Sequence, residues 1–517
     1  MNLLKKHFRL ILLFTILLVA LFLRLYRISE TQTFLEDEGR DMLIVKRQLD
    51  TGRPVLIGPQ TSTGSMYLGP LYYYFITPAL ILSGMDPVGP AILIAFTGVL
   101  TCYLLYKIFA KWSGQLSGFF AATLYAVMPL PVSFTRNSWN PNLAPLISLI
   151  TLYILDKLKD RTGNLKWFFW LGISAGVLIQ LHYMTLIYLA VIAILIFYWW
   201  VFPFNKKHFL KFGKGIFLGM AGFFLTLFPF FVFEIRNDWV NTNAISRFIV
   251  AKEERNIRYD LPVWLWEKKV VGTTADIFGG LFTRQEFVHS DNLSLYLIVA
   301  GLACVVLAIL FSSLNKHRKQ MIFFLLFGSL GAIGIYQENI HIHYLGFLFP
   351  LVYLAFASAL STKYIWVKAT ALIFGGFVLL YSFPTTVLKI GSGATHQKDK
   401  AEAVAAYISA HSEGQPYNIA SDEFTSTSPY QYYTYLLDNP PTSDHALNTF
   451  LICEGSPCRE ESIKNRRIFV TGPAHPTLGN YVGHPLATYV VEEPVVVSND
   501  HVKLGVWVAH LRLVKPE

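Results

Sequence analysis

The sequence has few charged side chains. Asp, Glu, Lys and Arg make up 15% of the 517 residues, whereas about 25% is usual in a soluble globular domain. Hydrophobic residues account for 53%, and the mean hydropathy is +0.44. This composition excludes an ordinary soluble fold and predicts a polytopic α-helical membrane protein.

Cysteine is also scarce, with four residues in the whole chain, which excludes a disulfide-rich secreted scaffold. Cys102 and Cys304 lie in apolar runs, where we expect inert packing thiols. Cys453 and Cys458 occur as Cys-Glu-Gly-Ser-Pro-Cys in a polar C-terminal region. Two thiols are too few for a structural zinc site, so a local disulfide is favoured.

Acidic residues are outnumbered by basic ones, and the formal charge is +10. Such a charge could indicate nucleic-acid binding, but here Lys and Arg form short clusters between apolar runs instead of one basic face. We interpret these clusters as signals of membrane topology.

The apolar runs predict the transmembrane segments. The first run, 8–23, follows Lys5, Lys6 and Arg9. Arg24 and Arg27 stand where a cleaved signal would have small residues, so we expect an uncleaved signal anchor with a cytoplasmic N-terminus. Later runs lie at 88–110, 117–134, 141–155, 167–184, 185–201, 215–233, 293–311, 321–337, 344–360 and 365–387. Together the runs predict about eleven spans.

Basic clusters occupy every second connection between these runs, at residues 107–111, 157–166, 206–214, 316–319 and 363–368. The positive-inside rule makes those connections cytoplasmic and places the C-terminus outside. The Tyr-rich segment 67–83 would reverse this alternation if it crossed the bilayer. We therefore expect it to be a helix lying in the outer interface, where tyrosines are favoured.

The predicted outer surface carries loops 29–87 and 234–292 and a polar C-terminal region. Residues 1–390 form the expected transmembrane domain, and residues 391–517 an extracytoplasmic α/β domain. In that domain we predict helices at 398–412 and 428–437, and strands at 417–420, 467–471, 488–497 and 502–514.

An acidic cluster, Phe-Leu-Glu-Asp-Glu-Gly-Arg-Asp at 34–41, follows the first span. If a helix begins at Glu36, Asp37 and Asp41 share one face, and Arg40 lies beside it. A carboxylate held in this way could take a proton from an incoming hydroxyl. Glu36 is expected to be solvated surface. The alternative is a solvated acidic helix start that the helix dipole favours.

Several short motifs follow the spans in a fixed order. They are Arg24-Leu25-Tyr26, Asp37-Glu38-Gly39-Arg40-Asp41, Gly69-Pro70-Leu71-Tyr72-Tyr73-Tyr74, Arg136-Asn137-Ser138-Trp139-Asn140-Pro141-Asn142, Phe233-Glu234-Ile235-Arg236-Asn237, and His343-Tyr344 with Pro350. Over residues 1 to about 390 this order resembles the protein mannosyltransferase and aminoarabinose transferase superfamily of GT-C glycosyltransferases, in its prokaryotic members.

The resemblance implies a membrane enzyme that moves a sugar from a polyprenyl-phosphate carrier to an acceptor outside the cytoplasm. Asp37 matches the family's catalytic Asp, and Glu38 matches its partner. Family members often carry a His-Pro-Pro-Leu or Lys-Pro motif where this chain has Gly69-Pro70-Leu71, so a usual contact residue is missing.

A leaving phosphate at the bilayer surface needs a cation. Arg136, Arg236 and His343 are all predicted at outer ends of spans, and Arg236 is preferred because Glu234 and Asn237 could fix its geometry. Each arginine could instead be an interfacial anchor. The remaining predicted substrate contacts are Arg40, Asp41, Tyr72, Asn140, Glu234 and Tyr344.

The sequence favours a mechanism without a cofactor. The turn at 136–142 has no carboxylate, unlike that of the metal-using oligosaccharyltransferase relatives, and His341 with His343 has no evident third ligand. A divalent cation stays open as the alternative. Trp239, Trp264 and Trp266 of the long loop could stack on sugars or anchor a surface helix.

We therefore expect an inverting glycosyltransferase with membrane lipids as its surroundings and a protein, lipid or glycan acceptor. A transporter or flippase, with Asp37 and Asp41 binding a cation or headgroup, is the main rival. Transporter sites usually lie near the midplane in repeated halves, and no repeat is visible here. An inactive scaffold whose C-terminal domain binds a partner is the third hypothesis.

Overall fold

The computed structural model describes residues 2–61, 66–159, 164–250, 263–282, 292–336, 340–392, 394–421, 427–441, 448–454, 468–471, 481–484, 489–491, 495–499 and 502–513. The chain forms two compact units. Unit 1 contains Met1–Tyr26, Leu56–Phe75 and Ile92–Ser392, and unit 2 contains Arg27–Val55, Ile76–Ala91 and Gly393–Glu517. Two segments of the first predicted loop thus join the C-terminal region in unit 2.

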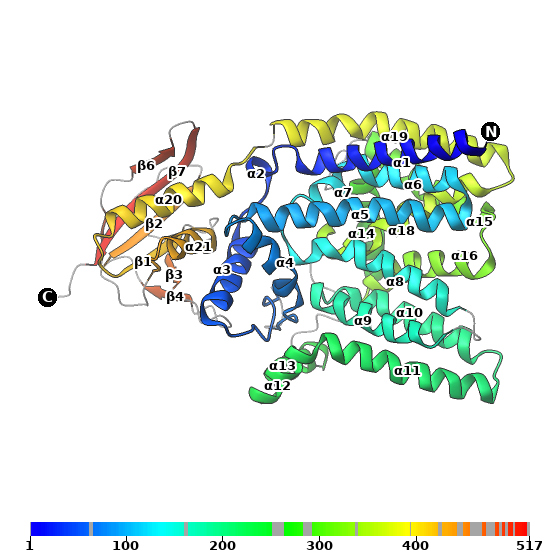
Figure 1. Cartoon of the computed structure of the whole chain (residues 1–517), viewed down its shortest axis with the longest axis horizontal. Coiled ribbons are helices and arrows are strands. Elements are labelled where there is room, and N and C mark those ends of the chain that lie inside the picture. Colours follow the sequence, from blue (N-terminus) through cyan, green and yellow to red (C-terminus); the bar gives the residue numbers. More distant parts are fainter. Residues whose placement is uncertain are drawn as a thin grey trace. The chain divides into compact units, whose positions relative to one another are not determined.

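Unit 1 is a helical bundle in which α1, α6, α11 and α19 run along nearly the same axis (Figure 1). Its main helices are α1 (Asn2–Leu25), α5 (Val88–Ser113), α6 (Gln115–Val127), α8 (Ala144–Leu158), α9 (Lys166–Leu181), α10 (Thr185–Val201), α11 (Lys206–Thr226), α14 (Val263–Phe282), α15 (Asn292–Phe311), α16 (Lys316–Phe323), α18 (Phe349–Ala357) and α19 (Ile365–Ser392). Of α5, the residues from Ile92 onward belong to unit 1. Shorter helices are α7 (Pro129–Phe134), η1 (Asn140–Leu143), α12 (Phe228–Arg236), α13 (Val240–Val250), η2 (Phe324–Gly328), α17 (Ser329–Ile333), η3 (Ile342–Leu348) and η4 (Ser358–Ser361).

The predicted apolar runs are largely helical in the described part of the chain. Five helical segments are long and apolar enough to cross a membrane: Lys5–Leu25, Val88–Ser113, Lys206–Thr226, Ile342–Ser361 and Ile365–Leu388. Shorter apolar helices occupy other runs. The Tyr-rich segment is confirmed as a helix, α4 (Leu71–Leu82), with Pro78 inside it.

Large apolar side chains on the outside of α1 suit a lipid-facing helix. Those left exposed include Phe8, Ile11, Phe14, Leu18 and Phe22. By contrast, every residue of α18 is buried. Exposed apolar helices around a fully buried one are the arrangement expected of a membrane bundle, and the chain is an integral membrane protein.

One arginine lies deep in unit 1. Arg24 is fully buried, and its guanidinium donates to the Thr135 hydroxyl at 2.8 Å and to carbonyls of Ala20, Tyr125 and Ala126 at 3.0–3.1 Å. These acceptors offset the cost of burying the charge. A Cβ at Gly98 would lie 2.5 Å from Arg24 Nε, so glycine makes room for this side chain.

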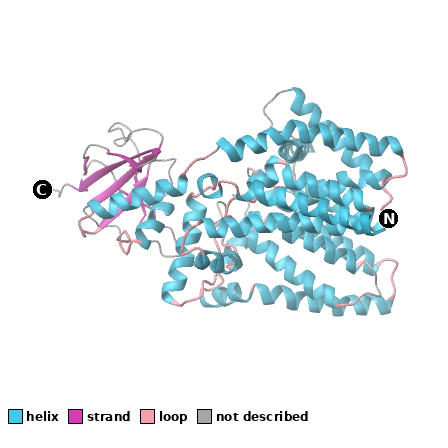
Figure 2. Cartoon of the chain, turned by 45° about the horizontal axis from the view of Figure 1, so that its top comes forward, coloured by secondary structure: helices cyan, strands magenta, loops and turns pink. Residues whose placement is uncertain are grey.

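The sheet of unit 2 has seven strands in the order β4-β3-β1-β2-β7-β5, with β6 also paired to β7 (Figure 2). The strands are β1 (Tyr417–Ser421), β2 (Asn448–Glu454), β3 (Ile468–Thr471), β4 (Tyr481–His484), β5 (Tyr489–Val491), β6 (Val495–Asn499) and β7 (Val502–Leu513). The β1–β2 pair is parallel, and the other pairs are antiparallel. Unit 2 also contains the helices α2 (Ile28–Thr31), α3 (Glu36–Thr51), α20 (Gln397–His411) and α21 (Ser428–Leu436), and the parts of α4 and α5 that lie within Ile76–Ala91.

Most predicted elements of the C-terminal region are confirmed. The helices at 398–412 and 428–437 are α20 and α21, and the strands at 417–420, 467–471 and 502–514 are β1, β3 and β7. The single strand predicted at 488–497 is wrong, because the structure has two strands there, β5 and β6. Strands β2 and β4 were not predicted. β2 lies between β1 and β7 and is buried along its middle, so its residues lack the alternation that marks a half-exposed strand.

The structure describes three of the four cysteines. Cys102 and Cys304 are free, and Cys453 is disulfide-bonded. Its predicted partner, Cys458, lies outside the described residues.

Candidate active site

The acidic cluster forms the first turn of α3 in unit 2. Leu35 is the N-cap, and its N–H donates to Glu38 Oε2 at 3.1 Å. The Thr33 hydroxyl donates to Glu38 Oε1 at 2.5 Å. Burial raises the pKa of Glu38, although the bond from Thr33 opposes this. Glu38, predicted as the partner of the base, therefore has both oxygens engaged in fixing the start of the helix.

Arg40 lies between two carboxylates on one face of α3, as the sequence predicts. Its Nη1 donates to Asp37 Oδ1 at 2.6 Å, while Nη2 and Nε donate to Asp41 Oδ1 at 2.8 and 3.1 Å. The exposed fractions of the two acidic side chains differ sharply, at 39% for Asp37 and 0% for Asp41. Only Asp37 of this pair is open to an incoming hydroxyl.

Asp41 is the unusual member of the group. Its Oδ2 is buried and has no hydrogen-bond partner among the residues that the structure describes. Burial raises the pKa of this carboxyl to about 7, against the opposing charge of Arg40. Asp41 thus holds the guanidinium from the protected side while Asp37 meets it from the open side.

Helix α3 rests directly on α21. A Cβ at Gly39 would lie 2.5 Å from Pro429 N, so the two backbones touch. The Ser428 hydroxyl donates to Glu36 Oε1 at 2.7 Å, and the ring of Phe34 meets Tyr432 and Tyr433 edge-on. Glu36 is exposed, as expected, but it also ties α3 to α21.

Arg136 of unit 1 occupies a structural position. It is buried, and its Nη1 and Nη2 donate to the carbonyls of Leu23 and Tyr26 at 2.7 and 2.8 Å. These carbonyls belong to the last turn of α1 and the residue after it, where a helix leaves acceptors unpaired. The geometry therefore explains Arg136 as a cap of α1, and a phosphate contact there stays a prediction.

The hypothesis that Glu234 and Asn237 fix Arg236 is wrong. Glu234 is fully buried and accepts the N–H groups of Asn241 and Thr242 at 3.1 and 2.7 Å, because the first turn of α13 needs acceptors. The Asn237 amide donates to Phe233 O at 2.8 Å instead. Arg236 is exposed at the end of α12, and no hydrogen bond or ion pair holds it within the described residues.

Glu234 supports a network that the sequence did not reveal. Asn241 Oδ1 accepts the N–H of Tyr67 at 2.6 Å, and its Nδ2 donates to Tyr67 O at 3.1 Å. The Tyr183 hydroxyl donates to the same carbonyl at 2.5 Å. These bonds fix the backbone just before the Gly69-Pro70 motif. No sequence pattern marks a buried Asn241 whose neighbouring backbone N–H groups are capped by the Glu234 carboxylate.

Gly69, where the family pattern has a larger side chain, is explained by packing. A Cβ at this position would lie 2.2 Å from Gln180 Oε1. Gln180 is itself fixed, since its Nε2 donates to the carbonyls of Gly176 and Thr226 at 3.0 Å. The space that a side chain at position 69 would need is thus occupied by the buried Gln180 of α9.

Four other predicted residues gather around the turn at 138–140. The Tyr72 hydroxyl lies 3.0 Å from Ser138 Oγ, and Asn140 Nδ2 donates to Leu181 O at 2.5 Å. The ring centroid of His343 lies 4.3 Å from that of Trp139. Tyr344 stacks on His182 at 4.4 Å. This aromatic cluster, consisting of Tyr72, Trp139, His182, His343 and Tyr344, lies entirely in unit 1.

The loop tryptophans differ in their surroundings. All three are exposed, but only for Trp266 is an indole hydrogen bond seen among the described residues, from its N–H to Gly331 O at 3.0 Å. Trp266 is therefore best explained by packing against α17. Within the described part of the chain, no three His, Cys, Asp or Glu side chains converge as metal ligands.

The chain is similar to one protein family and to several solved structures. Residues 68–233 match the family described as dolichyl-phosphate-mannose-protein mannosyltransferase. No curated protein sequence gives a significant match. Among solved structures, ArnT from Cupriavidus metallidurans bound to undecaprenyl phosphate has a TM-score of 0.58 and 11% identity, with 97% of each chain covered.

A second structure is the oligosaccharyltransferase AglB from Archaeoglobus fulgidus, in complex with an inhibitory peptide and a dolichol-phosphate. It is 13% identical over 78% of this chain and 58% of that chain, with a TM-score of 0.47. The similarity to ArnT shows a shared fold over 97% of the chain.

Proposed function

We propose that this protein is a GT-C glycosyltransferase that uses a lipid-linked donor. The motif resemblance to the protein mannosyltransferase and aminoarabinose transferase superfamily, the family match over residues 68–233 and the fold shared with ArnT support this proposal. The protein moves a sugar from a polyprenyl phosphate to an acceptor hydroxyl outside the cytoplasm. The observation that carries the proposal is Asp37, a part-exposed carboxylate on the first turn of α3, held by Arg40 beside the buried Asp41.

Asp37 acts as the general base. It takes the proton of the acceptor hydroxyl as that oxygen forms a bond to the anomeric carbon. The bond between the anomeric carbon and the phosphate oxygen breaks in the same step, and the electron pair leaves with the polyprenyl phosphate. A single displacement from the face opposite the leaving group inverts the anomeric configuration.

Arg40 orients the base. Its bond to Asp37 Oδ1 fixes one carboxylate oxygen and leaves Oδ2 for the acceptor. Because Nη2 and Nε are held by Asp41, the guanidinium has little freedom to turn. The partly buried pair thus holds the base in one orientation before substrate arrives.

Arg236 is the preferred cation for the leaving phosphate. Its exposure and its lack of an intramolecular partner among the described residues leave the guanidinium available to a ligand, whereas Arg136 caps α1. His343 and Tyr344 in the aromatic cluster are the proposed contacts to the remainder of the donor. An exposed arginine near a bilayer can also hold a lipid headgroup, so this role needs its own test.

The assignment is tested by reconstituting the protein in liposomes with a panel of radiolabelled polyprenyl-phosphate sugars and with protein, lipid and glycan acceptors. We expect consumption of at least one donor by the wild type and a reduced apparent affinity for that donor in Arg236→Gln. Solute uptake without turnover of any donor would instead support the transporter hypothesis.

Sidedness has a separate test in cells. In a Cys102→Ala, Cys304→Ala background, Gln415→Cys should react with an impermeant maleimide added outside, and Lys166→Cys should not. Both positions are exposed in the structure. Labelling of Lys166→Cys from outside would overturn the proposed orientation.

A further inference from the structure

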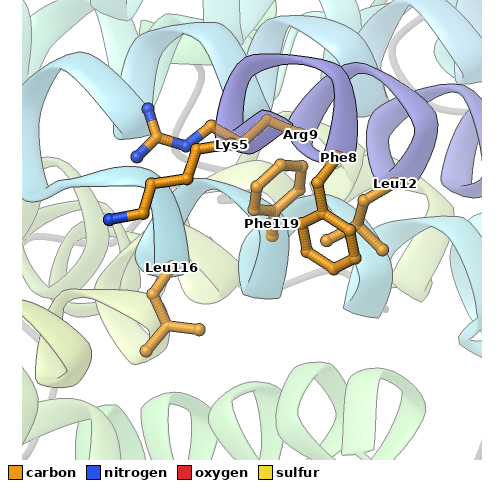
Figure 3. A pocket seen from close by; sticks show the side chains of 6 residues that line it. All are labelled: Lys5, Phe8, Arg9, Leu12, Leu116 and Phe119. Carbon is orange, nitrogen blue, oxygen red and sulfur yellow. The ribbon is translucent and has the colours of Figure 1, made fainter. Parts of the chain in front are cut away.

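A groove lies between the N-terminal end of α1 and the start of α6, both in unit 1. Its cavity measures about 470 Å³ and is lined by Lys5, Phe8, Arg9, Leu12, Leu116 and Phe119. Figure 3 shows the two cationic groups on one side of the groove and the rings of Phe8 and Phe119 with Leu12 on the other. The groove therefore has a charged end and an apolar end.

Lys5 and Arg9 are one helical turn apart and project from the same face of α1. Both side chains are exposed. No carboxylate pairs with either of them in the part of the chain that the structure describes. Two neighbouring cations without a counter-ion attract an anion, and Arg adds a planar pair of donors suited to phosphate.

Two other cations of unit 1, Arg318 and Lys159, already have partners within the unit. The Arg318 guanidinium at the start of α16 lies 4.9 Å from the ring centroid of Trp112 at the end of α5. This contact joins the two helix ends. Asp156 at the end of α8 is engaged by Arg318 and Lys159 at 3.0 Å each. Lys5 and Arg9 differ from these two cations, because no carboxylate engages them in the described residues.

The other end of the groove leads to the apolar surface of α1, where Phe8, Ile11 and Phe14 are more than half exposed. Such a surface contacts acyl chains in a membrane. An occupant must therefore combine a compact negative group with a hydrocarbon tail that leaves along α1. A soluble anion would use only the charged end and leave Phe8, Leu12, Leu116 and Phe119 uncovered.

We propose that this groove is a binding site for an anionic glycerophospholipid. The lipid phosphate lies between Lys5 and Arg9, and an acyl chain lies on Leu12, Leu116 and Phe119. A zwitterionic lipid fits less well, because its ammonium group would approach the same two cations. Under the proposed orientation the lipid belongs to the cytoplasmic leaflet, whose anionic headgroups attract such basic clusters.

Native mass spectrometry of the full-length purified protein tests the site, with phosphatidylglycerol and phosphatidylcholine titrated separately. The key variant is Lys5→Gln, Arg9→Gln, and its matched control is Lys206→Gln, Lys207→Gln, two exposed cations that begin α11 outside the groove. We expect wild type and control to prefer phosphatidylglycerol. The groove variant should bind it roughly thirtyfold more weakly, from the loss of two charge contacts.

A third variant tests the apolar lining of the groove. Leu116→Trp fills the groove and leaves both cations, so it should also lower phosphatidylglycerol binding. Melting curves of all variants establish that each is folded. Equal phosphatidylglycerol binding by the groove variant and the control would overturn the site, as would equal affinity of the wild type for the two lipids. Inorganic phosphate is added separately in the melting experiments. If it raised the melting temperature of the protein as much as phosphatidylglycerol does, the lipid assignment would be overturned.

Discussion

Gly39 of α3 lies against the backbone of Pro429 at the start of α21, so closely that a Cβ at position 39 would be 2.5 Å from the proline nitrogen. The helix that carries Asp37 is therefore seated backbone to backbone on a helix that lies nearly 400 residues later in the sequence. This contact and the hydrogen bond from Ser428 to Glu36 hold α3 against the C-terminal region. The C-terminal region therefore helps to position Asp37, the proposed base.

We expect Gly39→Ala to reduce turnover and to lower stability. The contact atoms belong to the backbone and cannot rotate away, so α3 or α21 must shift, at a typical cost of about 1–3 kcal/mol for overpacking. Thermal unfolding and donor turnover measure the two effects. Gly213→Ala on α11 is the control, because its Cβ would meet nothing within 4 Å. Wild-type values for Gly39→Ala would show that the contact does not position α3.

The buried carboxyl of Asp41 should make stability depend on pH. Burial raises its pKa to about 7 in the folded protein, whereas an unfolded Asp has a pKa of about 3.9. The folded state then binds the proton more tightly, so this contribution to stability is full below about pH 4 and is lost as pH rises to about 7. Above pH 7, Asp41→Asn should melt higher than the wild type, since it retains an oxygen for Arg40.

Melting temperatures at pH 5 and pH 8 test this prediction. The difference between Asp41→Asn and the wild type should grow with pH. Glu38→Gln is a useful comparison, because burial also raises the pKa of Glu38 and gives an effect of the same sign. A constant difference between Asp41→Asn and the wild type across this range would mean that Asp41 does not titrate there.

Glu234→Gln should destabilise the region around Tyr67. Its Oε2 accepts Thr242 N–H at 2.7 Å, and an amide cannot provide acceptors to both backbone N–H groups. Leaving one buried donor unsatisfied costs about 1–3 kcal/mol. Melting temperature reports the loss, and Asp238→Asn serves as an exposed neighbouring control. A melting temperature unchanged from wild type would show that the cap contributes little.

We expect donor turnover to survive treatment with EDTA. The proposed step needs one carboxylate base and protein cations, and the turn at 136–142 supplies no carboxylate to a metal. Turnover is measured before and after chelation, with Mg²⁺ and Mn²⁺ added back. Loss of activity that either cation restores would favour the metal-dependent alternative.

Local patterns in the sequence predicted the helices and the shared face of Asp37, Arg40 and Asp41, because both follow from periodicity. They could not show that Gly39 touches Pro429 or that Asn241 binds Tyr67, since these contacts join distant segments. Glu234 was predicted to orient Arg236 because the two residues are close in the sequence. In the structure its carboxylate instead accepts the unpaired backbone N–H groups at the start of α13. Arg24 was interpreted as the end of a span, and only the structure reveals its buried acceptors.

The most direct test of the central claim compares Asp37→Asn with Glu36→Gln in the reconstituted assay with a donor that the wild type consumes. Glu36 lies in the same turn, is exposed, and as Gln can still accept the bond from Ser428. We predict that Asp37→Asn loses about 10²–10⁴-fold in turnover, as removal of a general base does, and that Glu36→Gln keeps nearly all of it. Equal turnover by Asp37→Asn and the wild type would contradict Asp37 as the base.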